Sequence, residues 1–300
     1  MHTETSAKVI ADSFTVNPKH RITTMEVTLH RFVLAEFNTH RVFSRNSASS
    51  RAIPVEKMLE RFIGDPAMPL AWPAEQPGMQ GGEELQGQDA VDARKLFNQV
   101  WANTEFLIQE YLKSHPDKSG RLHKSLINRL MEPFMWHTII VTSTEWENFF
   151  SQRCSPLAQP EMRVAAEKMR EAYQASTPLE ILHPQWHTPY IREDEQDLDI
   201  KTKLMVSAAR CARVSYLTHD GVRDIQEDVN LFKRLMTADP PHWSPLEHVA
   251  TPALRAPEPG NFNSWSQLRH NPFLTTIREE LFPAKPKRKR LTKQIGRAHV

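Results

Sequence analysis

The chain has 300 residues, which is enough for one large domain or two small ones with an ample apolar core. Its 38 Lys and Arg against 36 Asp and Glu leave a formal charge of +2, so composition gives no case for a nucleic-acid partner. Two cysteines, Cys154 and Cys211, are too few for a disulfide framework and favour a reducing, cytoplasmic setting. No apolar run reaches about 18 residues and no signal-peptide core is visible, so we expect no membrane partner.

Strands are expected first, over residues 8–37, because polar and apolar side chains alternate at 23–29. A short helix is expected over 54–62. Four prolines and several glycines among polar residues then predict a long loop over 64–88.

Two amphipathic helices are expected next, over 89–114 and 120–131, because their apolar residues recur at helical spacing. We expect the apolar faces of both helices to pack into the core. The residues concerned are Leu96, Phe97, Val100, Trp101, Phe106, Leu107, Tyr111 and Leu112 in the first helix and Leu122, Leu126, Ile127 and Leu130 in the second.

Residues 135–141 form an apolar run that predicts a buried segment. Thr144, with Glu147 three residues later, matches a capping box, so a helix should begin there. A further helix, rich in charge, is expected over 160–175. Residues 178–200 contain three prolines and mark a boundary in the chain.

Polar hydrogen-bond donors are concentrated in residues 40–51. Three arginines, a histidine, an asparagine and four serines lie within these twelve residues, and only Val42 and Phe43 are bulky and apolar. The stretch closely follows an apolar run at 32–35, which we expect to be a buried strand. Arginines suit bidentate contacts to phosphate, and hydroxyl groups can complete the oxygen shell. The stretch therefore predicts an anion or nucleotide cradle, with a plain polar turn as the alternative.

The spacing within this stretch resembles the signature of the flavin-dependent thymidylate synthases (the ThyX family), usually written R-H-R-x-x-S-x-N-E-x-S-x-R. Two positions depart from the signature: Thr39 replaces its first arginine, and Ser47 replaces its glutamate. The matching residues are His40, Arg41, Ser44, Asn46, Ser49 and Arg51.

Residues 129–134, 144–153 and 158–161 resemble the second half of the same family pattern. The resemblance implies that Asn148 contacts flavin. It also implies that Arg153 contacts the uracil ring of dUMP and favours its ionised form, which would make Arg153 the catalytic residue. The alternative is that Arg153 is an ordinary surface arginine at a helix end.

Residues 208–216 and 242–248 resemble the amino-terminal part of the family but lie after the signature, so the chain resembles a circularly permuted, divergent and phage-like member. Because termini often lie close together, permutation is compatible with one fold. The helix expected between the two blocks carries Val229, Leu231, Phe232, Leu235 and Met236. A coincidental short match is the alternative. We hypothesise that Arg269, which follows this block, supplies part of the charge that Thr39 lacks.

The resemblance implies an α/β (α+β) fold with an antiparallel-rich sheet and packed helices. We expect a single catalytic domain over 1–284, with the signature and nucleotide-binding segment at 1–190 and the permuted flavin-binding segment at 200–272. The basic run at 285–290 begins a tail that we expect to be disordered. The final residues, 295–300, resemble translated sequencing adapter, so we expect an artefact there.

The implied reaction is reductive methylation of dUMP to dTMP. Methylenetetrahydrofolate donates the carbon, and FAD reduced by NADPH supplies the hydride. The implied assembly is a homotetramer with active sites shared between subunits. By position, the resemblance implies that FAD is bound by His40, Arg41, Asn46, Thr142, Asn148, His242, Ser244 and Arg269. It likewise implies that dUMP is bound by Glu36, Thr39, Ser47, Ser49, Arg51, Arg129 and Arg153.

Glu36 stands where the family usually has glutamine, and a carboxylate near an anionic nucleotide is unfavourable unless it is protonated or paired. Two alternatives therefore stay open: related flavin chemistry, such as hydroxymethylation of dUMP or dCMP, and a non-catalytic nucleotide-binding homologue. His183 and His187 have ligand-like spacing, but the prolines near them argue against one helix presenting both, so no metal site is expected. Cys154 could act as a nucleophile if the adjacent arginine lowered its pKa, but we expect a structural residue.

Overall fold

A computed structural model of the chain describes residues 3–15, 17–214, 224–254 and 260–281. The predicted basic run at 285–290, the adapter-like residues 295–300 and the last two residues of the block at 208–216 lie outside the described residues. Within the described part of the chain, no helix is long and apolar enough to cross a membrane.

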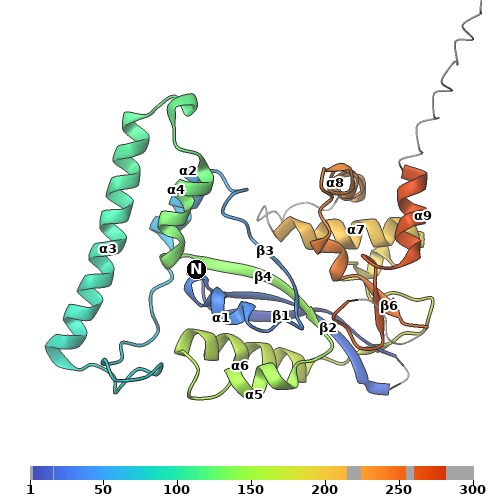
Figure 1. The fold of residues 1–300 in the computed structure, drawn as a ribbon, viewed down its shortest axis with the longest axis horizontal. Coiled ribbons are helices and arrows are strands. Elements are labelled where there is room, and N and C mark those ends of the chain that lie inside the picture. The colour runs from blue at the N-terminus through green and yellow to red at the C-terminus, as the bar shows by residue number, and fades with distance from the viewer. Residues whose placement is uncertain (1–2, 16, 215–223, 255–259, 282–300) are drawn as a thin grey trace, which may run out of the picture.

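A five-stranded sheet forms the centre of the molecule, in the order β3-β4-β2-β1-β5 (Figure 1). Neighbouring strands are antiparallel except β5, which runs parallel to β1. The expected antiparallel-rich α/β fold is therefore confirmed. The strands are β1 (Ser6–Thr15), β2 (Asn17–His30), β3 (Ser44–Ser47), β4 (Trp136–Ser143) and β5 (Leu179–Glu180).

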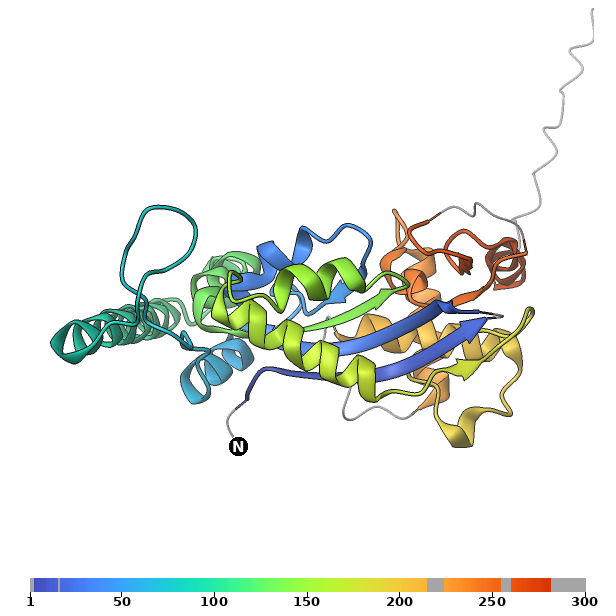
Figure 2. The same cartoon turned by 90° about the horizontal axis from the view of Figure 1, so that it is seen from below.

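One face of the sheet is covered by α1 (Leu34–Asn38), α5 (Glu147–Arg153) and α6 (Pro160–Ala175), and Figure 2 shows α5 and α6 along it. Because side chains alternate along a strand, the same residues of β2 and β4 that face these helices form the main core. This core includes Met25, Val27, Leu29, Ile139, Val141, Phe149, Met162 and Met169.

The opposite face is covered at one end by helices from the C-terminal part of the chain. Cys211 and Val214, at the end of α7, pack against Ile140 of β4. The elements at this end are α7 (Ile200–Arg213), α8 (Ile225–Thr237), η6 (Ser244–Glu247), α9 (Pro272–Leu281) and the hairpin of β6 (Ala250–Pro252) and β7 (Trp265–Gln267).

At the other end of this face lie α2 (Val55–Gly64) and α4 (Lys124–Met131), with the long helix α3 (Gly87–Ser114) beyond them (Figure 1). A separate apolar cluster holds these helices to the start of β4. The predicted helices at 54–62, 89–114, 120–131 and 160–175 and the loop between the first two are thereby confirmed to within a few residues.

The apolar run at 32–35 is not a strand, which corrects the prediction of strands up to residue 37. Strand pairing ends at His30, and the chain continues through the short 3-10 helix η1 (Arg31–Val33) into α1. Val33 and Phe37, four residues apart, both point into the core. A helix this short leaves too little sequence for its period to be distinguished from that of a strand.

The predicted capping box at Thr144 is also wrong. The helix α5 begins at Glu147, its first flanking residue is Trp146, and no side chain caps it. The Thr144 hydroxyl instead accepts a hydrogen bond from the backbone N–H of Asn263, at 3.0 Å. A long-range contact therefore uses the group that the local pattern assigned to the cap.

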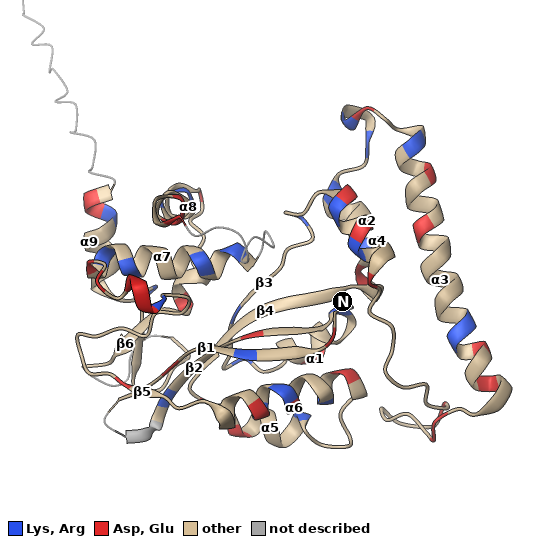
Figure 3. Cartoon of the chain, turned by 180° about the vertical axis from the view of Figure 1, so that it is seen from behind, with Lys and Arg blue, Asp and Glu red and all other residues tan. Residues whose placement is uncertain are grey.

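The core packing expected for α3 and α4 is found for only part of their apolar residues. Ile108 and Ile127 are buried, and Trp101, Tyr111 and Leu112 pack against the same cluster. The other apolar side chains are largely exposed: Leu96, Phe97, Val100, Phe106 and Leu107 on α3 and Leu122, Leu126 and Leu130 on α4. Figure 3 shows charges of both signs along α3, with uncharged residues between them.

Candidate functional site

The middle of the signature, Ser44 to Ser47, forms β3, an edge strand that pairs with the second half of β4, and the other signature residues lie just before and just after it. Ser44 and Asn46 are buried, whereas Arg45 and Ser47 are half-buried, as the two-residue period of a strand requires. The strand therefore presents two different sets of side chains on its two faces.

Arg153 joins several of the predicted site residues. At the last position of α5, its Nε donates to His40 Nε2 at 2.9 Å and its Nη2 donates to Thr39 Oγ1 at 3.0 Å. Its Nη2 also lies 3.4 Å from the backbone oxygen of Glu36. Arg153 is therefore half-buried and bonded to the signature segment, and its role toward dUMP stays a prediction.

Burial, and then the positive charges of Arg153 and Arg45, together lower the pKa of His40 to about 4. The imidazole is therefore neutral near pH 7, with Nε2 free of a proton so that it can accept from Arg153. The ring also lies edge-on to Phe149, with 4.9 Å between the ring centroids. A neutral histidine thus orients a charged arginine without competing with its charge.

Glu36 has one carboxylate oxygen, Oε2, that is buried without a hydrogen-bond partner among the described residues. Its backbone oxygen accepts from Thr39 Oγ1 at 2.7 Å. Thr39 replaces the first signature arginine, and the guanidinium of Arg153 lies next to it and donates to its hydroxyl oxygen.

Asn46 connects the signature to the block at 242–248, about two hundred residues later in the chain. Ser244 Oγ donates to Asn46 Oδ1 at 2.9 Å, and Asn46 Nδ2 donates to the backbone oxygen of Cys211 at 2.8 Å. Two residues assigned to flavin by resemblance are therefore in direct contact, although the side-chain amide of Asn46 is already engaged by the protein.

Asn261 and Gln267, which the sequence did not single out, hold the start of β3 against the C-terminal part of the chain. Ser44 Oγ lies 3.1 Å from Asn261 Oδ1 and 3.0 Å from Gln267 Nε2. Asn261 Nδ2 also donates to the backbone oxygen of Val42 at 2.8 Å. No local pattern marks such contacts, because each joins residues more than two hundred positions apart.

Arg269 forms an ion pair with Glu247 and is partly exposed. Arg45 lies near the same carboxylate, and its guanidinium donates to the backbone oxygens of Asn38 and His40. Burial lowers the pKa of Arg45, and Glu247 opposes that shift. Within the described residues, the group that reaches Thr39 is thus Arg153, while Arg269 is held at Glu247.

Ser49, Arg51 and Arg129 lie in the two segments that approach the start of β4. Asn128 Nδ2 donates to the backbone oxygens of Ser50 and Ile53, which ties α4 to the loop after β3. Arg129 is exposed and pairs with Glu132 at 3.6 Å. The register of β3 pairs Ser44 with Thr142 and Ser47 with Ile139, and the backbone N–H of Ala48 donates to Thr138, so the chain approaches the start of β4 as it reaches Ser49.

The Thr142 hydroxyl belongs to a buried chain of hydrogen bonds below the site. It lies 2.7 Å from Thr24 Oγ1 and 2.8 Å from His248 Nδ1. Thr24 also contacts His187 Nε2 at 2.8 Å, and His187 Nδ1 contacts Ser13 Oγ at 3.0 Å. Both ring nitrogens of His187 are therefore engaged, and burial lowers its pKa to about 3.

The remaining predicted flavin residues, Arg41, Asn148 and His242, have exposed side chains. Cys154 is not activated as its neighbour in sequence suggested. Arg153 points to His40, and burial raises the pKa of the Cys154 thiol, opposed by the charge of Arg170. Cys154 packs against the main core, which supports its structural role.

A family model described as thymidylate synthase complementing protein matches residues 8–179. The chain belongs to this family. The matched region covers the signature and the second block, so the resemblance stated for both is confirmed. It ends before the block at 208–216, and the circular permutation therefore stays a prediction.

Two groups of solved structures are similar. A UMP/dUMP methylase PolB from Streptomyces cacaoi, bound with 5-Br UMP, has 17% sequence identity over 57% of this chain and 89% of that chain, with a TM-score of 0.43. Thymidylate synthase X (ThyX) from Helicobacter pylori, with FAD and dUMP, has 19% identity over 51% of this chain and 68% of that chain, with a TM-score of 0.32. A search among curated proteins finds no match.

Proposed function

We propose that this protein is a flavin-dependent thymidylate synthase that converts dUMP to dTMP in the cytoplasm, with FAD as cofactor, methylenetetrahydrofolate as carbon donor and NADPH as reductant. Membership of the thymidylate synthase complementing protein family supports a flavin-dependent enzyme that modifies a pyrimidine nucleotide. The observation that carries the proposal is the arrangement of Arg153, His40 and Thr39, in which a neutral histidine orients a charged arginine at the signature.

In this proposal Arg153 binds the uracil ring. The Nε of Arg153 donates to His40 and its Nη2 donates to Thr39, and these two hydrogen bonds fix the plane of the guanidinium. The remaining donors can bond a carbonyl oxygen of uracil, and the positive charge favours the ionised ring. The chain therefore supplies orientation and charge at the base, and FAD, when bound, supplies the hydride chemistry.

The residues near Asn46 fit a flavin cofactor with its pyrophosphate. Ser244 is exposed and lies beside Asn46, and exposed Arg41 and His242 belong to the same two blocks. Arg45 and Arg269 add positive charge around the single carboxylate of Glu247. A set of hydroxyl and cationic donors of this kind suits a dianionic pyrophosphate.

We propose further that the nucleotide site is completed by a second copy of the chain, within a homotetramer. Within one chain, Arg153 contacts Glu36, Thr39 and His40, and no hydrogen bond or ion pair among the described residues joins this group to Ser49, Arg51 or Arg129. The exposed apolar residues of α3 and α4 provide a surface of the kind that subunit interfaces cover. Arg129 lies on α4 itself, so contact through α4 would bring an arginine toward a neighbouring site.

The first experiment is to purify the protein with FAD and add NADPH and dUMP without air. A flavin band that bleaches faster with dUMP, followed by formation of dTMP detected by mass, is the expected result. Arg153→Ala should reduce kcat/KM for dUMP by at least a hundredfold, because it removes a charged contact to the base. Arg163→Ala, which removes a half-exposed arginine of α6, is the matched control and should leave activity unchanged. Protein that takes up no FAD would contradict the proposal.

A second candidate is modification of a cytosine nucleotide, such as hydroxymethylation of dCMP. The unpartnered Oε2 of Glu36 favours it, because a carboxylate can accept a hydrogen bond from the exocyclic amine of cytosine. Parallel turnovers of dUMP and dCMP, with product masses, separate the two enzymes. A protein that binds the nucleotide and never oxidises NADPH would instead be a non-catalytic homologue.

A further inference from the structure

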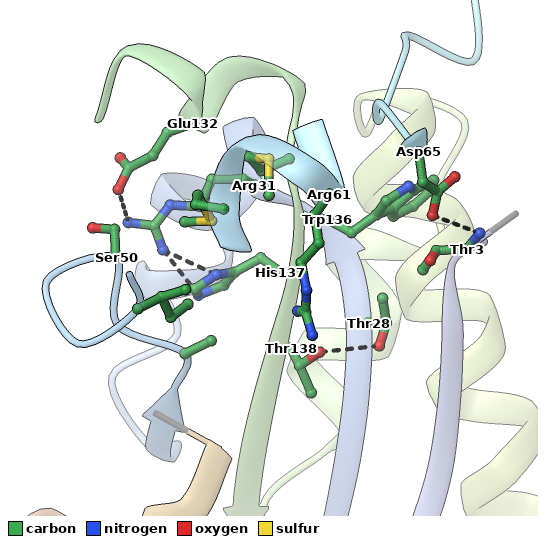
Figure 4. A pocket seen from close by; sticks show the side chains of 14 residues that line it. Thr3, Thr28, Arg31, Ser50, Arg61, Asp65, Glu132, Trp136, His137 and Thr138 are labelled. Atoms are coloured by element: carbon green, nitrogen blue, oxygen red, sulfur yellow. Dashed lines mark hydrogen bonds and ion pairs between the residues drawn. The ribbon is translucent and has the colours of Figure 1, made fainter. Parts of the chain in front are cut away.

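A cavity of about 330 Å³ lies on the sheet face that α2 covers, at the start of β4 (Figure 4). This volume is in the range of small-molecule sites. None of the residues assigned to flavin or to dUMP lines it. Its walls come from the N-terminal segment, β2, the loop after β3, α2 and the start of β4.

The floor of the cavity is polar. Thr28 and Thr138 are cross-strand partners whose hydroxyl oxygens lie 3.4 Å apart, and Trp136 lies two residues before Thr138 on the same face of β4. Figure 4 shows Arg61 reaching from α2 toward these two threonines. Ser50, in the loop after β3, adds a further hydroxyl group.

Two of the lining groups are donors that lack a partner. The indole Nε1 of Trp136 is buried with no hydrogen-bond acceptor among the described residues. Arg61 has no ion pair with any carboxylate that the structure describes. An indole N–H and a guanidinium can only donate, and a buried donor without an acceptor costs about 1–3 kcal/mol. The buried Trp136 N–H therefore calls for an acceptor, and the exposed guanidinium of Arg61, which lines the same cavity, can donate to that acceptor as well.

The acidic residues that line the cavity are already engaged. Glu132 pairs with Arg31 at 3.3 Å and with Arg129 at 3.6 Å, and Asp65 accepts from the backbone N–H of Thr3 at 2.8 Å. His137 is neutral, because burial and then the charge of Arg31 lower its pKa to about 3. Arg31 thus neutralises Glu132, while Arg61 and Asp65 keep their charges, and Arg61 is the cation that lines the cavity without an ion pair among the described residues.

We propose that this cavity is a second ligand site, which binds a small organic anion beside the residues assigned to the nucleotide but through a different set of side chains. The anionic group, a carboxylate or a phosphate, accepts from Arg61, the Trp136 N–H and the threonine hydroxyls. Met58, Ile53 and Met135 line the same cavity and contact the apolar part of the ligand. The site does not depend on the flavin reaction.

The test is calorimetric titration of the full-length protein with benzoate and, separately, with inorganic phosphate. We expect one molecule of at least one probe to bind per chain. Arg61→Gln should weaken binding about tenfold or more, since it removes the cation, and Trp136→Phe, which keeps a ring and removes the N–H, several-fold. Lys57→Gln removes an exposed charge from the same helix α2 and should change nothing.

Arg51→Gln distinguishes the cavity from the proposed nucleotide site, because Arg51 belongs to the latter and does not line the cavity. Phosphate binding that survives Arg51→Gln and is lost in Arg61→Gln supports the cavity. Binding of phosphate alone assigns a phosphorylated ligand, and binding of benzoate alone a carboxylate. Failure of both probes to bind, or binding insensitive to Arg61→Gln and Trp136→Phe in variants that unfold at the wild-type temperature, overturns the proposal.

Discussion

The α7–α8 pair and the α3–α4 pair lie at the two ends of the molecule, and they bury their apolar residues to very different extents. On α7 and α8 the apolar side chains are buried, including Leu204, Leu231 and Phe232. On α3, Phe106 and Leu107 are 62% and 65% exposed. Both pairs show amphipathic periodicity in sequence, so the period predicts that a helix has an apolar face but not what covers it.

The two pairs also differ in their polar contacts. Between α7 and α8, Arg210 and Arg213 share Asp228, and Arg210 makes a bidentate contact with Glu195 at 2.5 and 2.6 Å. By contrast α3 is held by single contacts, such as the bond from Trp101 Nε1 to the backbone oxygen of Phe62 at 2.9 Å. The α7–α8 pair is therefore part of the folded core, whereas the apolar side chains of α3 stay exposed and could contact a second copy of the chain.

The largest expected effect comes from truncating matched aromatic residues. Phe232→Ala should cost about 3–5 kcal/mol of unfolding free energy, because it leaves a cavity in a packed core. Phe106→Ala, at an exposed position, should change it by less than about 0.5 kcal/mol. Urea unfolding at low protein concentration, which disfavours the proposed assembly, measures both. Equal losses would abolish the distinction between the two helix pairs.

Asp228→Ala should cost roughly 3 kcal/mol, at the lower end of the range for a broken buried ion pair, because Glu195 still neutralises Arg210. Glu110→Ala is the control, since its partner Lys113 and Glu110 are both exposed on α3. Thermal unfolding compares the two variants. A similar Tm in both would mean that the buried charge cluster contributes no more than a surface pair.

Leu107→Glu and Leu126→Glu should lower the mass of the assembly without unfolding the chain, because a charge placed in an apolar subunit interface opposes association. Sedimentation velocity reports the mass, and circular dichroism the fold. The control is Glu105→Gln, a mild change on the same helix. An unchanged mass in both leucine variants would exclude this surface as a subunit interface.

The smallest expected effect concerns pH. The folded-state pKa of His40 is about 4, below its ordinary value of 6.5, so the unfolded chain binds the proton more readily between these two values. Stability is therefore complete above about pH 6.5 and falls as pH decreases toward 4. His40→Gln should make this pH dependence shallower in urea unfolding series. A steeper dependence would contradict the assigned neutral state.

Sequence patterns predicted much of the secondary structure and the family. The helix over 160–175 is predicted to the residue. The signature spacing singles out His40 and Thr39, and the second block singles out Arg153, which the structure places in contact with both. The errors have two causes. At 32–35 the helix is too short for its period to be distinguished from that of a strand. At Thr144 and on α3 the local pattern is real, but contacts with distant parts of the chain, present at Thr144 and missing on α3, decide how the side chains are used.

The sequence by itself determined which residue types are available: arginines and hydroxyls at the signature, and periodic apolar faces on the helices. Only the tertiary structure decided that Ser244 meets Asn46, that Asn261 and Gln267 hold Ser44, and that Arg61 and Trp136 share a cavity. The physical reason is that periodicity and capping act over a few residues, whereas these contacts join strands and helices far apart in the chain, where packing alone selects the partner.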